Sequence, residues 1–101
     1  MKIDFHNHFY PPGYLEKFEQ WGRGRYEFVP GKGGLKIVKQ KGARFLAITP
    51  QHVSVDQRLE DMDRLGIDME VLTLTSPNVY FSTRRRNQYL AKMSNDFFAD
   101  L

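Results

Sequence analysis

Residues 2–9 read Lys2-Ile3-Asp4-Phe5-His6-Asn7-His8-Phe9, and the interpretation of the whole chain starts from this stretch. Its alternation predicts a β-strand, in which residues i and i+2 point to the same face. On that pattern His6 and His8 share one face with Asp4. The other face is expected to carry Ile3, Phe5, Asn7 and Phe9. The two imidazoles would then converge on one point, as two ligands of one metal ion must.

The strand is followed by a helical segment and then by a β insert. Prolines and a glycine at 11–13 end the strand, because proline cannot donate to a ladder. Residues 13–20 have the apolar spacing of one or two helical turns. A small antiparallel insert at about 22–49 is predicted from three β-like runs, at 26–29, 35–39 and 44–49. Its glycine and lysine content favours a surface excursion over a core layer.

A helix is predicted from Val55 to Leu65. Ser54 is a favourable N-cap, Gln57 completes a capping box with it, and Gly66 suits the C-terminal cap. The helix carries an apolar stripe that we expect to pack in the core, formed by Val55, Leu59, Met62 and Leu65.

A second strand at 69–75 and a second long helix from Ser82 or Thr83 complete the pattern. The order strand, helix, strand, helix predicts an α/β fold with a parallel sheet. A parallel sheet needs cover on both faces, and two strands with their helices cannot provide it. We therefore expect residues 1–101 to form part of a larger domain.

Composition narrows the classes of function. The 101 residues are 41% hydrophobic and 27% charged, which is typical of a globular protein. The chain has no cysteine, which excludes disulfides, thiolate nucleophiles and cysteine-bound zinc. A net charge of +3 is too small for a dedicated nucleic-acid binder. No apolar run approaches a membrane span, and the strand starting at residue 2 or 3 leaves no room for a signal peptide, so we expect a cytoplasmic protein.

The third histidine and the arginines are weaker candidates. His52 lies in a predicted loop, where a hydrogen-bonded histidine is more common than a third metal ligand. Residues Arg84 to Arg86 and Arg44 are interpreted as solvated side chains, with a grip on a substrate carboxylate or phosphate as the alternative. A solvated face is also expected for the helical carboxylates, Asp56, Glu60, Asp61 and Asp63.

Four stretches together form a more specific pattern. They are Ile3-Asp4-Phe5-His6-Asn7-His8-Phe9 with Pro11-Pro12, residues 58–68 (RLEDMDRLGID), the strand at 71–75, and Asn95-Asp96 in the last helix. With them the chain resembles the N-terminal part of the amidohydrolase superfamily. More narrowly, it is similar to the amidohydrolase-related branch that includes aminocarboxymuconate-semialdehyde decarboxylase and γ-resorcylate decarboxylase. The resemblance covers nearly the whole chain and is weakest between Trp21 and Thr49.

The resemblance implies a fold, a metal and a reaction. The chain would supply the first two strand–helix units of a (β/α)₈ TIM barrel with a divalent metal, usually zinc, at its C-terminal face. His6 and His8 map onto two metal ligands of the family. A histidine and an aspartate from later strands, beyond Leu101, would complete the site. The expected enzyme is a decarboxylase (carboxy-lyase) of an unsaturated or aromatic carboxylic acid, in which the metal lowers the pKa of a bound water towards ~7.

Two alternatives stay open. A metal-dependent hydrolase of the same superfamily would share His6 and His8, and the β insert favours the decarboxylase over it. A non-catalytic basic module could instead bind an anionic partner through Lys32, Lys36, Lys39, Lys41 and Arg84 to Arg86. For the enzyme we expect a small-molecule carboxylate as substrate, a parent protein whose homo-oligomeric state is open, and little or no catalysis by the 101-residue chain alone.

Overall fold

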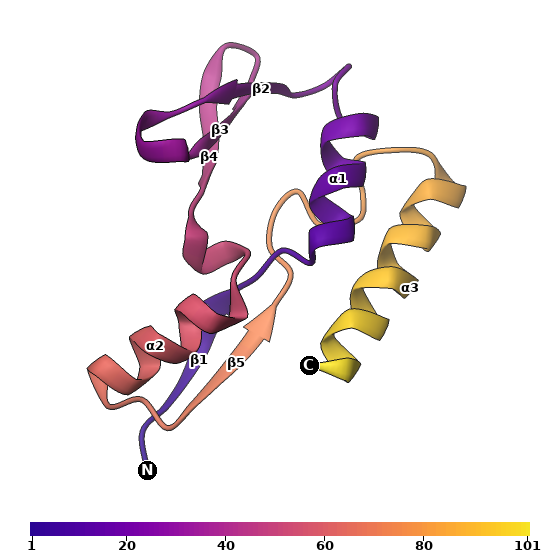
Figure 1. Ribbon diagram of the computed structural model, residues 1–101. Helices are drawn as coiled ribbons and strands as arrows, with labels where there is room; N and C mark the ends of the chain where they lie inside the picture. The colour runs from indigo at the N-terminus through magenta and orange to yellow at the C-terminus, as the bar shows by residue number, and fades with distance from the viewer.

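The backbone follows the predicted order of strands and helices. The computed structural model describes all residues, 1–101, and its α/β class is as expected from the sequence (Figure 1). Two sheets and three α-helices are present, with two short 3₁₀ helices, η1 and η2. In chain order the elements are β1 (Ile3–His8), α1 (Pro12–Trp21), β2 (Glu27–Pro30), η1 (Lys32–Gly34), β3 (Lys36–Gln40), β4 (Ala43–Ile48), η2 (Pro50–His52), α2 (Val55–Leu65), β5 (Met69–Thr73) and α3 (Arg84–Asp100).

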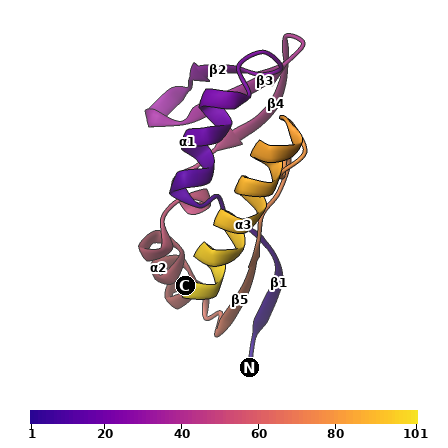
Figure 2. The same ribbon diagram turned by 90° about the vertical axis from the view of Figure 1, so that its right-hand side faces the viewer.

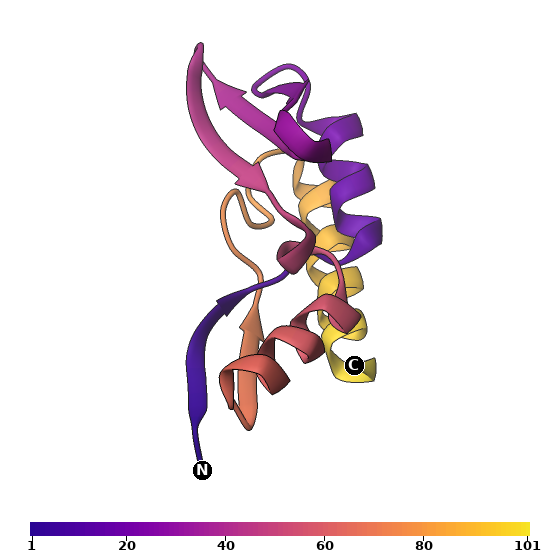
Figure 3. The same ribbon diagram turned by 60° about the vertical axis from the view of Figure 1, so that its left-hand side comes forward.

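β1 and β5 form a two-stranded parallel sheet, and one of its faces has no helix on it. Glu70 pairs with Arg58 of α2 at 2.9 Å, and Leu72 borders grooves shared with α2 and α3. Val71, between Glu70 and Leu72, points the other way and is 39% exposed. Both helices therefore lie on one side of the sheet, as Figure 3 shows, and the opposite face is bare.

The caps of α2 are as predicted, but its packing is not. Ser54 Oγ accepts the Gln57 backbone N–H at 3.1 Å, and Gly66 ends the helix with a φ of 69° in the left-handed region. The Gln57 side chain bonds to Asp61 instead of closing a capping box. The expected core stripe is wrong, since Leu59 is 52% exposed and no residue of α2 is buried. A sheet of two strands is too narrow to cover the helix.

The main core lies at the other end of the molecule, between α1, the insert and α3 (Figure 2). β2, β3 and β4 form the expected antiparallel meander. Its interpretation as a surface excursion is wrong, because side chains from its strands join the aromatic core. The fully or nearly buried members of this core are Tyr10, Tyr14, Phe18, Tyr26, Val38, Ile48, Phe81 and Leu90. The lysines of the insert suggested a solvated surface, but they do not all point to solvent. Lys36 points to α1, where its Nζ pairs with Glu19 at 2.6 Å.

Candidate metal and ligand site

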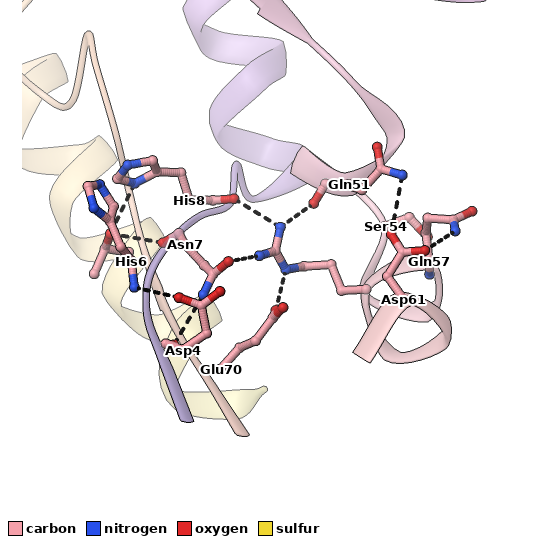
Figure 4. Close-up of polar contacts among 11 residues, drawn as sticks. Asp4, His6, Asn7, His8, Gln51, Ser54, Gln57, Asp61 and Glu70 are labelled. Atoms are coloured by element: carbon pink, nitrogen blue, oxygen red, sulfur yellow. Dashed lines mark hydrogen bonds and ion pairs between the residues drawn. The ribbon is translucent and has the colours of Figure 1, made fainter. Parts of the chain in front are cut away.

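The two histidines of β1 lie side by side. Their ring centroids are 5.0 Å apart and their planes are nearly perpendicular, at 87°. Figure 4 shows both imidazoles on one side of β1, with Glu70 and Gln51 on the other side. His8 is the last residue of the strand, so the pair sits at the carboxyl end of a parallel strand and on the face that no helix covers.

A bulge in β1 changes the rest of this face. From Asp4 to Asn7 the strand advances three residues while its partner advances two, from Glu70 to Leu72. Asp4 therefore lies opposite Glu70, on the side of α2, and the expected grouping of Asp4 with the two imidazoles is wrong. Its Oδ1 accepts the backbone N–H of His6 at 3.2 Å, which fixes the bulged backbone instead of orienting a ring.

Hydrogen bonding determines which nitrogen of His8 is free. Thr73 Oγ1 donates its single proton to the carbonyl oxygen of Asn7 at 3.1 Å. The 3.2 Å contact between Thr73 Oγ1 and His8 Nδ1 must then have the imidazole as donor. With the proton on Nδ1, the lone pair of His8 lies on Nε2, which makes no hydrogen bond within the chain. A ring held in this way by its second nitrogen is typical of a metal-binding histidine.

Arg58 joins the elements around the histidine strand, and the sequence did not reveal this role. Its side chain is only 11% exposed and pairs with Glu70 of β5 at 2.9 Å. Its Nη2 donates to Asn7 Oδ1 at 2.8 Å, and its Nη1 donates to the carbonyl oxygens of Gln51 and His8 at 2.7 and 3.3 Å. One guanidinium of α2 thus holds the end of β1, η2 and β5 together.

Two features of the sequence could have identified Arg58 as a buried residue. Arg58 is three residues after Val55 and four before Met62, so it shares the apolar face of the predicted helix. Its partner Glu70 interrupts an otherwise apolar strand. A charge on the inner face of each element is the expected sequence pattern of a buried ion pair.

His52 has the opposite arrangement to His8. Its Nδ1 accepts the backbone N–H of Thr49 at 3.1 Å and lies 3.1 Å from the hydroxyl of the same residue, in a capping box at the start of η2. A backbone N–H can only donate, so the neutral ring carries its proton on Nε2. Burial, and then the electrostatic effects of the neighbouring Arg58 and His8, lower the pKa of His52 below its ordinary value. The interpretation of His52 as a hydrogen-bonded loop histidine agrees with this geometry.

A pocket of about 320 Å³ opens beside His8, at the carboxyl ends of β1 and β5. His52 and Tyr10 line it together with residues of β4, among them Phe45 and Ala47. Burial raises the pKa of Tyr10 to about 12, and its hydroxyl donates to the carbonyl oxygen of Ser76 at 2.7 Å. The phenol therefore keeps its proton and is already engaged, so it is not a free donor for a ligand in the pocket.

The histidine pair fits half of a zinc site. Two imidazoles bound to one tetrahedral zinc through ~2.0–2.1 Å bonds have ring centres about 5 Å apart, close to the separation seen here. No group of three or more histidine, aspartate or glutamate side chains comes together in a metal-binding arrangement. Within these 101 residues His6 and His8 are thus the candidate ligands, and a catalytic site would need more from elsewhere.

Other than Arg58, the basic residues for which contacts are seen lie away from the histidine pair. The Arg86 guanidinium lies 5.0 Å from the centre of the Trp21 ring, and Lys17 Nζ lies 5.2 Å from the same ring. Lys36 is engaged by Glu19, and Arg44 is exposed on β4. None of the three helices combines the length and the apolar character needed to cross a membrane.

No model of a known protein family matches the chain, and a search of curated proteins finds no match to it.

Proposed function

We propose that this chain contributes the first two strand–helix units of a larger metal-dependent enzyme with a (β/α)₈ barrel, related to the amidohydrolase superfamily. The observation that carries the proposal is the placement of His6 and His8. They are adjacent, they end a parallel strand, and they lie on its helix-free face. In a barrel the helices are outside and the active site is formed at the carboxyl ends of the strands, where this pair would lie.

Each residue near the pair has a defined part in this proposal. His6 and His8 hold a divalent metal, which we propose to be zinc, with His8 binding through Nε2 because Thr73 takes its Nδ1 proton. Arg58 fixes the carboxyl end of β1, the strand that carries both histidines, by donating to the His8 carbonyl oxygen. A metal bound there supplies Lewis acidity to a substrate oxygen. The remaining ligands and the acid–base group come from later strands of the barrel.

Within this class we favour a decarboxylase of an unsaturated or aromatic carboxylic acid. The antiparallel insert, β2 to β4, returns to the carboxyl end of β1, and its Phe45 and Ala47 line the pocket beside His8. A wall of this kind suits a planar apolar acid. A hydrolase of the same superfamily would use the same histidine pair, and the two reactions differ in residues outside this chain.

The proposal predicts that metal content and turnover depend on the histidine pair in the full-length protein. Zinc bound per protein and CO₂ release from aromatic and unsaturated acids would be measured for the parent and for the His6→Ala/His8→Ala variant. We expect loss of both in the variant, because two of the protein ligands are missing. A matched control is Lys41→Ala, at an exposed turn of the insert, which should retain both. A double variant with full metal and full turnover would contradict the proposal.

A further inference from the structure

The pocket beside His8 contains a second histidine whose chemistry differs from that of the metal candidates. His8 and His52 border the same cavity of about 320 Å³. His8 presents a lone pair at Nε2, because its Nδ1 donates to Thr73. His52 presents an N–H at Nε2, because its Nδ1 accepts from Thr49. His8 can therefore bind a cation, whereas His52 can donate a hydrogen bond to an acceptor oxygen.

The donor of His52 is both fixed and free. The capping box at η2 holds the ring at one nitrogen, and the ring also packs against Tyr10, with centroids 5.6 Å apart. The other nitrogen makes no hydrogen bond within the chain. This nitrogen is not fully buried, because the only buried side-chain polar atom without a partner is Ser94 Oγ. The ring that carries the Nε2–H lines the pocket and is held by the loop.

We propose that His52 is a ligand-binding residue that donates its Nε2–H to an oxygen of a carboxylic acid held in the pocket beside His8. The choice of a carboxylic acid rests on the function proposed above. The Tyr10 hydroxyl is already engaged by the Ser76 carbonyl oxygen, and the other polar side chains that line the pocket are the hydroxyls of Thr75 and Ser76. The insert supplies an apolar wall through Phe45 and Ala47. His52 would thus orient the acid and would take no part in holding the metal.

The same geometry argues against His52 as a third metal ligand. Coordination through Nε2 would require the proton to move to Nδ1. There it would face the Thr49 backbone N–H, a donor that cannot become an acceptor. To bind a metal the ring would have to give up the hydrogen bond from the Thr49 N–H, and only the Thr49 hydroxyl, 3.1 Å from Nδ1, could accept its proton.

Two substitutions distinguish the role of the Nε2–H donor of His52 from the role of its hydrogen bond with the Thr49 N–H. In His52→Asn the side-chain oxygen can still accept the Thr49 N–H near the place of Nδ1, but the donor at Nε2 is lost. In His52→Gln the amide nitrogen reaches the place of Nε2, but the cap is lost. Folding of each variant would be checked by its amide NMR spectrum.

Benzoate is the probe, titrated into the metal-free 101-residue chain and followed by NMR shifts of the pocket residues. We expect saturable binding to the wild type and roughly tenfold to hundredfold weaker binding to His52→Asn, the usual effect of losing a hydrogen bond to a charged group. His52→Gln should retain much of the binding. Absence of saturable shifts, unchanged binding by His52→Asn, or equal loss in both folded variants would overturn the assignment.

A zinc titration of the same variants separates this inference from the proposed function. If His52→Asn loses the zinc-induced shifts of His6 and His8, then His52 is a metal ligand and the assignment is overturned. If zinc leaves His6 and His8 of the wild type unchanged while benzoate binding still depends on His52, the metal proposal fails and the carboxylate assignment stands.

Discussion

Replacing Arg58 with methionine is expected to lower the free energy of unfolding by about 3–5 kcal/mol, the usual cost of breaking a buried ion pair from one side. The pair with Glu70 is 11–12% exposed, and the substitution would leave the Glu70 carboxylate buried without its partner. It would also remove the donor to Asn7 and the donors to the carbonyls of Gln51 and His8. Urea unfolding followed by circular dichroism measures the loss.

Two further variants show that the effect belongs to this ion pair. Arg64 lies on the same helix with its side chain 68% exposed and pairs with Asp61 at 3.2 Å. Arg64→Met should change stability by no more than about 0.5 kcal/mol, since exposed pairs contribute little. Adding Glu70→Leu to Arg58→Met should recover part of the loss, because the unpaired buried charge is then gone. An Arg58→Met chain as stable as the Arg64→Met chain would contradict the role given to Arg58.

Replacing Phe18 with alanine should cost about 3–5 kcal/mol, as expected for deleting a buried aromatic ring. Phe18 is fully buried at the centre of the aromatic core. Its ring lies 4.9 Å from that of Phe28, 5.1 Å from Phe81 and 5.3 Å from Tyr26. The cavity would separate α1 from the insert and from the loop before α3, and the same urea measurement detects it.

Phe5 is the matched control for the core. It has the same side chain, but it is 73% exposed on β1. Phe5→Ala should leave stability within about 0.5 kcal/mol, as for most exposed positions. Equal effects at Phe5 and Phe18 would mean that the insert does not pack on α1 as described, and that the core lies over the β1–β5 sheet instead.

Local patterns in the sequence predicted the elements well, because the residues that start and end them act over three or four positions. Ser54 and Gly66 bound α2 as expected, and the glycine-rich turns separate the strands of the meander. The location of the core was not predictable in this way. The apolar stripe of α2 has the period of a buried helix, yet Leu59 and Leu65 have no layer to pack against.

The candidate site was likewise predicted only where local sequence determines it. The adjacency of His6 and His8 follows from the strand period and is observed. The face on which Asp4 lies was predicted wrongly because a bulge adds one residue to β1. No residue type in that stretch indicates the bulge. The contrasting proton positions of His8 and His52 depend on Thr73 and Thr49, and the first of these contacts joins residues 65 positions apart. Such pairings arise only once the chain is folded.

The most direct test of the account is a Zn²⁺ titration of the chain, followed by the ¹⁵N signals of its three imidazoles. We expect Nε2 of His6 and of His8 to shift together, with the proton of His8 remaining on Nδ1 and with His52 unchanged. Zinc binding itself, measured by calorimetry, should be lost in His6→Ala/His8→Ala. Zinc that shifts His52 but leaves the pair unchanged, or that binds equally well to the double variant, would contradict the claim that the end of β1 is half of a metal site.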